Sequence, residues 1–118
     1  MSDLTITVRE ESGIPVVAAV GELDVDRAPE LRSELEALAS SGASTVVIDL
    51  SGTAYIDSTG LGVLVAARKR AVQAGGELRL VCPDPALRKV FEITGVWEYF
   101  SIHESLGSAL SGSTSSAG

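Results

Sequence analysis

Hydrophobic and polar residues alternate at the start of the chain. Leu4, Ile6 and Val8 are separated by polar residues, and this period of two is typical of a half-buried β-strand. A turn at residues 11–13 then leads into the more uniformly apolar run 15–20. Because only a short turn separates the two runs, we expect them to form an antiparallel hairpin.

After the hairpin, the pattern indicates helices that alternate with strands. Leu31, Leu35 and Leu38 fall on one face of a helix that includes Pro29 in its first turn. Residues 45–50 are mostly β-branched or aliphatic, which is typical of a buried central strand. This second region therefore predicts a helix that leads into the middle of a sheet.

The rest of the chain continues this alternation. The expected elements are a helix from the segment 57–60 to about Ala74, a strand over 78–81, a helix from Asp84-Pro85 to Thr94, a short edge strand over 99–102 and a last helix over 105–110. The predicted fold is α/β, with a mixed sheet of four to five strands, an N-terminal antiparallel hairpin and about four covering helices. Residues 1–110 are expected to form one domain, and the Ser/Gly-rich residues 111–118 a disordered tail.

Composition and charge limit the ligands and the cellular location that are compatible with this sequence. The 118 residues carry a net charge of −7, which disfavours nucleic-acid binding, and the basic run Arg68-Lys69-Arg70 is interpreted as a solvated helix face. The start of the chain lacks a signal-peptide pattern, and no apolar run approaches the roughly 20 residues that a membrane span needs. The single cysteine, Cys82, cannot form an intramolecular disulfide. We therefore expect a cytoplasmic protein that does not bind membranes.

Motifs of enzyme chemistry are missing from the sequence. It has no phosphate-binding loop, no dinucleotide fingerprint and no nucleophile elbow. The lone His103 has no cysteine or acidic residue at ligand spacing, and Asp49 and Asp57 are too far apart to predict a metal-assisted phosphoaspartate site. The expectation is a protein without catalytic residues, metal or cofactor.

The segment 57–62, Asp-Ser-Thr-Gly-Leu-Gly, carries the most information. Three hydrogen-bonding side chains stand where a loop becomes a helix, and one of them is expected to be the N-cap. Glycine in a helix is unfavourable by up to about 1 kcal/mol, so Gly60 and Gly62 require another reason. We predict that both glycines leave the helix start open, so that another molecule can approach the hydroxyl groups of Ser58 and Thr59.

The predicted helix has two different faces. At about 100° per residue, the face expected to pack on the sheet consists of Gly60, Leu64, Ala67 and Ala71. The opposite face is small and mildly polar, and consists of Gly62, Ala66, Lys69 and Gln73. This second face, flanked by Val65 and Val72, is predicted to contact a partner protein.

These residues resemble a known family, the anti-sigma factor antagonists, whose domain is called STAS. The similarity covers about residues 4–110 and depends most on the segment 57–62 in its place after the third strand. Its other matching segments are Gly-Glu-Leu-Asp at 21–24, Val-Ile-Asp-Leu at 47–50, Tyr-Ile at 55–56, Val-Leu at 63–64, Gly-Gly at 75–76 and Phe-Glu-Ile-Thr-Gly at 91–95.

The resemblance implies a phosphorylation switch. In that family a partner that is both anti-sigma factor and ATP-using serine kinase phosphorylates the serine after the aspartate, which is Ser58 here. The unphosphorylated antagonist binds this partner and releases a sigma factor, and a serine phosphatase restores it. Thr59 is the alternative acceptor, and the free protein is expected to be a monomer. The resemblance places these residues in or beside the partner surface: Asp24, Asp57, Ser58, Thr59, Gly60, Leu61 and Gly62.

Two other functions are compatible with parts of the sequence. A STAS domain can serve as a scaffold subunit of a transporter or of a lipid-trafficking complex, although the intact segment 57–62 favours the antagonist. A small nucleotide-dependent enzyme is the other alternative, and the missing phosphate-binding loop argues against it.

Overall fold

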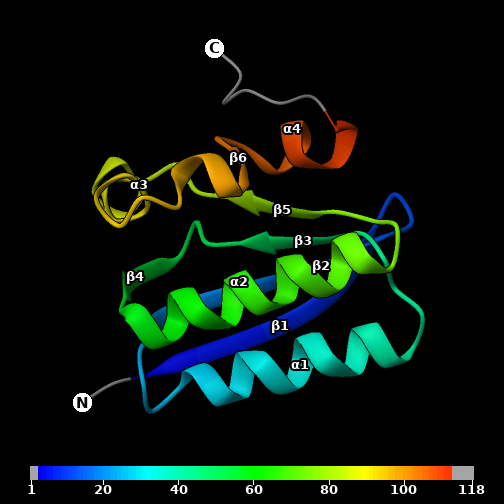
Figure 1. The fold of residues 1–118 in the computed structure, drawn as a ribbon, viewed down its shortest axis with the longest axis horizontal. Helices are drawn as coiled ribbons and strands as arrows, with labels where there is room; N and C mark the ends of the chain where they lie inside the picture. Colours follow the sequence, from blue (N-terminus) through cyan, green and yellow to red (C-terminus); the bar gives the residue numbers. More distant parts are fainter. Residues whose placement is uncertain (1–2, 113–118) are drawn as a thin grey trace.

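The computed structural model describes residues 3–112, in which six strands form one mixed sheet (Figure 1). The elements in chain order are β1 (Leu4–Glu11), β2 (Ile14–Leu23), α1 (Ala28–Ser40), β3 (Val46–Asp49), β4 (Thr53–Ile56), α2 (Ser58–Gln73), β5 (Leu78–Val81), α3 (Pro85–Ile93), the 3-10 helix η1 (Trp97–Tyr99), β6 (Ser101–His103) and α4 (Leu106–Ser111). The α/β class, the N-terminal hairpin and the four helices are as predicted.

The sheet is organised around β2. On one side β2 pairs antiparallel with the whole length of β1, with Leu4 opposite Gly21 and Glu11 opposite Ile14. The hairpin turn uses positive φ angles at Ser12 (54°) and Gly13 (79°). On the other side the order continues through β3, β5 and β6, and these pairs are parallel. Parallel pairing places the carboxyl ends of these strands at the same edge of the sheet.

One of the six strands, β4, is not predicted from the sequence. The sequence suggests four to five strands, with residues 51–56 as a connection; instead β4 pairs with the end of β2, beyond the part of β2 that pairs with β3. Thr53 and Ile56 are its buried residues, and their spacing of three shows no period of two. The strand is fixed by tertiary contacts such as the hydrogen bond of 2.6 Å that the Thr53 hydroxyl donates to the Ala19 carbonyl.

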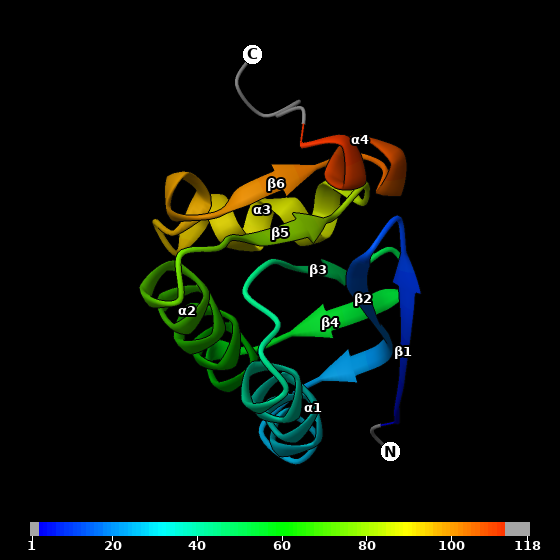
Figure 2. The same cartoon turned by 90° about the vertical axis from the view of Figure 1, so that its right-hand side faces the viewer.

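The two faces of the sheet are covered unequally (Figure 2). On one face α1, α2 and α3 bury a large apolar core that includes Leu31, Leu64 and Phe91. On the other face, the short α4 is the only helix of the described residues that packs, and its Ala109 lies against Val16, Val47 and Val81. None of the helices in the described part of the chain is long and apolar enough to cross a membrane.

The C-terminal elements differ slightly from the prediction. The edge strand β6 begins at Ser101, because residues 97–99 form η1 instead. Helix α4 includes Ser111, so the predicted tail starts too early by this residue, and Gly112 ends the helix with a φ of 80°. The predicted disorder of the remaining tail concerns residues 113–118, which lie outside the described residues.

Candidate functional site

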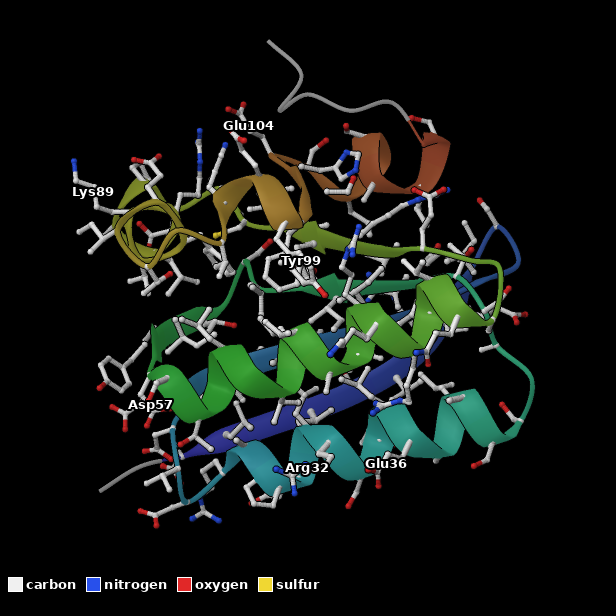
Figure 3. All side chains as sticks on the ribbon, viewed as in Figure 1. Arg32, Glu36, Asp57, Lys89, Tyr99 and Glu104 are labelled. Atoms are coloured by element: carbon white, nitrogen blue, oxygen red, sulfur yellow. The ribbon has the colours of Figure 1, made fainter. Side chains whose placement is uncertain are left out.

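Ser58 is the first residue of α2, and its side chain is exposed. The chain reaches it from β4, which ends at Ile56, and Asp57 forms the N-cap of the helix. Figure 3 shows Asp57 at the N-terminal end of α2, where the helix leaves the sheet. The predicted cap is therefore present, and of the three candidate side chains it is the aspartate that provides it.

Asp57 connects two separate segments of the chain. Its Oδ1 accepts a hydrogen bond of 3.0 Å from the backbone N–H of Gly60, in the first turn of α2. Its Oδ2 accepts a bond of 2.9 Å from the N–H of Val25, in the loop between β2 and α1. A carboxylate that receives backbone N–H groups on both oxygens holds them more strongly than a neutral acceptor would. Asp57 thereby fixes the loop beside Ser58.

The loop between β2 and α1 is also held by its own aspartate. The Oδ1 of Asp24 accepts hydrogen bonds of 3.1 Å from the N–H groups of Asp26 and Arg27. Asp24, Asp26 and Asp57 therefore give this end of the molecule a concentration of negative charge. A further negative group placed among them would be repelled.

The two glycines of α2 have different roles. Gly62 is exposed, and a Cβ added to it would meet no atom within 4 Å, as predicted for an open helix start. The same prediction is wrong for Gly60, which is buried. A Cβ there would lie 2.5 Å from the Leu23 carbonyl oxygen and 2.9 Å from the Cγ1 of Ile56. Gly60 therefore allows α2 to pack against the end of β2.

The remaining faces of α2 agree with the helical pattern. The predicted inner face is buried, while Gly62, Ala66 and Lys69 are exposed on the outer face. Leu61 is buried, so neither it nor Gly60 offers a side chain to a partner. The accessible residues, which we call the Ser58 surface, are Asp24, Val25, Asp57, Ser58, Thr59, Gly62, Ala66 and Lys69.

Val25 was not identified from the sequence. Its side chain is 61% exposed, although valine is normally buried, and its backbone is bound by Asp57 beside Ser58. The only sequence signal is its place directly after Asp24 in the segment 21–24. Tyr55, at the end of β4, is also 51% exposed, so two large apolar side chains stand uncovered near this end of the molecule.

The basic run of α2 is not a uniform solvated face, which corrects the interpretation from sequence. Arg68 lies over the ring of Tyr99, with its guanidinium carbon 4.2 Å from the ring centre. Lys69 is exposed, as predicted, but Arg70 is partly buried and lines a cavity together with residues of α1. Helical geometry sends three consecutive side chains in different directions, and neighbouring elements cover two of them.

The other chemistry-bearing residues have structural partners. His103 is buried, and its ring nitrogens lie 3.1 Å and 2.8 Å from the hydroxyl groups of Ser101 and Ser108. Asp49 accepts hydrogen bonds from the backbone and hydroxyl of Ser51, which close the turn before β4. Within residues 3–112, no group of three or more histidine, cysteine or acidic side chains is placed to hold a metal ion.

Cys82 is expected to resist thiol reagents in the folded protein. Burial raises the pKa of its thiol from 9.0 to about 11, and the charge of Asp84 adds to the shift while Arg88 opposes it. Because the pKa of Cys82 is higher in the folded protein than in the unfolded chain, the contribution of the protonated thiol to folding stability is complete below pH 9. It is lost as the pH rises towards 11. Ellman's reagent at pH 8 should label Cys82 slowly in buffer and rapidly in denaturant. Rapid labelling in buffer would contradict the buried position.

Comparison with known proteins agrees with this geometry. The family model described as STAS domain matches residues 5–109. An anti-sigma-B factor antagonist of Bacillus subtilis is 37% identical over 100 residues, which cover 85% of this chain and 91% of that protein. This chain belongs to the anti-sigma factor antagonist family. The antagonists are regulators and not enzymes, as the missing catalytic motifs suggested.

Solved structures of antagonists share the fold. The crystal structure of an anti-sigma factor antagonist from Mycobacterium paratuberculosis has a TM-score of 0.86 and 30% identity, and covers 93% of both chains. The antagonist SpoIIAA in its unphosphorylated form has a TM-score of 0.76 and 19% identity, over 90% of this chain and 93% of its own. SpoIIAA has also been solved in a phosphorylated form, with a TM-score of 0.70 and 20% identity, over 91% of this chain and 97% of its own.

Proposed function

We propose that this antagonist binds an anti-sigma factor serine kinase when Ser58 is unphosphorylated, and that it thereby releases a sigma factor in the bacterial cytoplasm. The kinase uses ATP to phosphorylate Ser58, which ends the binding, and a serine phosphatase restores the hydroxyl. The observation that carries the proposal is the exposed Ser58 side chain at the first position of α2, beside a loop held by Asp57.

The Ser58 surface supports binding by a closely fitting partner. Gly62 has open space around it and Ala66 is exposed, so a partner can approach the α2 backbone closely on this side. Val25 contributes an exposed apolar contact, and Asp24 and Asp57 contribute negative charge. Charge at the edge of such an interface mainly raises the association rate and selects the partner.

Phosphate on Ser58 is expected to change binding more than folding. The phosphate adds about −1.5 to −2 charges, and the α2 dipole favours a negative group there by about 0.3–1 kcal/mol. Repulsion from Asp57 opposes it by about 1 kcal/mol at 4 Å in water. These two effects nearly cancel within the free protein. In the complex, by contrast, the phosphate would be desolvated among acidic groups without a counter-charge, which costs several kcal/mol.

A phosphorylated protein of the same fold supports a switch by phosphorylation. SpoIIAA, which shares the fold, exists in phosphorylated and unphosphorylated forms. In this chain, Ser58 is the more accessible of the two hydroxyl residues in the segment, because Thr59 is partly buried.

Phosphosite mapping tests the proposal. The protein is incubated with ATP and each anti-sigma factor kinase of its source bacterium, and the products are analysed by intact-mass and peptide mass spectrometry. We expect one phosphate on Ser58, none in Ser58→Ala, and phosphate still on Ser58 in Thr59→Val, which removes the alternative hydroxyl. Phosphate on Thr59 in the Ser58→Ala variant would mean that Thr59, one residue later, is the acceptor. No incorporation with any of these kinases, together with no complex formation, would overturn the proposal.

A further inference from the structure

Helices α1 and α2 leave a cavity of about 240 Å³ between their C-terminal ends. The two helices lie alongside one another and end on the same side of the molecule (Figure 1). Much of the cavity wall comes from six residues with minimal side chains: Ala39, Gly42, Ala43, Ala67, Ala71 and Ala74. Such side chains are too short to fill the space between two helices, whereas protein interiors are normally close-packed.

The backbone around this cavity is already hydrogen-bonded. At the end of α1, the carbonyls of Leu38 and Ala39 accept bonds from the N–H groups of Ala43 and Gly42. At the end of α2, the carbonyl of Ala71 accepts a bond of 2.8 Å from Gly76. The helix ends therefore offer few free polar groups, and the wall is mainly apolar.

Among the residues that the structure describes, Arg70 is the one charged residue that lines the cavity. It is partly buried, and no carboxylate among residues 3–112 forms an ion pair with it. The arginines that do form ion pairs in this part of the chain are Arg9, Arg27, Arg79 and Arg88. Arg70 lies in the last turn of α2, where the helix dipole favours a cation, and without an ionic partner its guanidinium remains available to pair with an anion in the cavity.

We propose that this cavity binds a small amphipathic anion, a medium-chain aliphatic carboxylate. Its carboxylate pairs with the guanidinium of Arg70, and its chain lies among the alanines of α1 and α2. The volume suits this class, because apolar cavities of about 150 Å³ accept benzene and sites for drug-sized ligands start at about 300 Å³. The site lies at the opposite end of α2 from Ser58, and it does not depend on the proposed function.

Calorimetric titration and thermal unfolding with octanoate test the site, at concentrations below micelle formation. Octanoate should bind and raise the Tm, because a ligand that binds only the folded state stabilises it. Octanol lacks the charge and acetate lacks the chain, so both should bind at least about tenfold more weakly. Equal binding of octanol would overturn the assignment of an anionic ligand.

Three variants locate the site. Arg70→Gln should weaken octanoate binding about tenfold or more by removing the charge. Ala39→Leu should weaken it similarly by filling the space, and since Ala39 is exposed at the rim, the core does not have to move. Lys89→Gln, which removes an exposed cation from α3 (Figure 3), should bind octanoate as the wild type does. Absent binding up to millimolar octanoate, or wild-type affinity in Arg70→Gln, would overturn the proposal.

Discussion

Replacement of Ser58 by aspartate should weaken binding to the cognate anti-sigma factor kinase by about a thousandfold. A carboxylate desolvated in the interface without a counter-charge costs about 4 kcal/mol, and each 1.4 kcal/mol changes the affinity by about tenfold. The fold should be nearly unaffected, because Ser58 is exposed and an acidic residue in the first turn of a helix is compatible with the helix dipole. Calorimetry or surface plasmon resonance gives the affinity, and thermal unfolding gives the Tm.

Two further substitutions separate charge from size. Ser58→Asn has nearly the same volume as Ser58→Asp but carries no charge, so it should bind the kinase much more tightly than Ser58→Asp does. Ser58→Ala should bind and resist phosphorylation. A large fall in the Tm of Ser58→Asp, or equal loss of binding in Ser58→Asn, would mean that Ser58 acts through packing rather than through charge.

Replacement of Gly60 by alanine should destabilise the protein by about 3 kcal/mol or more. The added Cβ would lie 2.5 Å from the carbonyl oxygen of Leu23 and 2.9 Å from the Cγ of the same leucine. The close backbone oxygen cannot rotate away as a flexible side chain would, so α2 must shift from the end of β2. For a chain of this length, the Tm should fall by roughly 10 °C or more.

Gly62 provides the matched control for this prediction. It is two residues away on the same helix, and a Cβ there meets no atom within 4 Å. Gly62→Ala should therefore stabilise the protein by about 0.5–1 kcal/mol, because alanine is the better helix former. Denaturant unfolding of both variants gives the free energies. Similar stability of the two alanine variants would contradict the packing described for Gly60.

Local signals predicted most of the fold. The alternation in β1 and the turn at residues 11–13 predict the hairpin. The dipeptide Asp84-Pro85 marks the start of α3, where the Asp84 side chain accepts a hydrogen bond from the N–H of Ala86. These features depend on neighbours in sequence. Strand β4 depends on its pairing with β2, some 30 residues earlier, so four residues without alternation could not reveal it.

The site was predictable to the same extent. The change from loop to helix and the capping residue types place Ser58 at an exposed helix start without any tertiary information. The second bond of Asp57 could not be predicted, because Val25 is 32 positions away. The buried position of Gly60 depends on Leu23, and the positions of Arg68 and Arg70 depend on Tyr99 and on α1, all of which only the folded chain brings near.

The double hydrogen bonding of Asp57 has a consequence for how a modifying enzyme recognises this protein. The carboxylate joins the β2–α1 loop to the first turn of α2, so the Ser58 hydroxyl belongs to a folded surface made from two distant segments of the chain. An extended peptide with the sequence of residues 57–62 lacks the second stretch. Under the proposed function, we therefore expect the kinase to phosphorylate Ser58 in the folded protein and not in such a peptide, and unfolding should abolish both phosphorylation and partner binding.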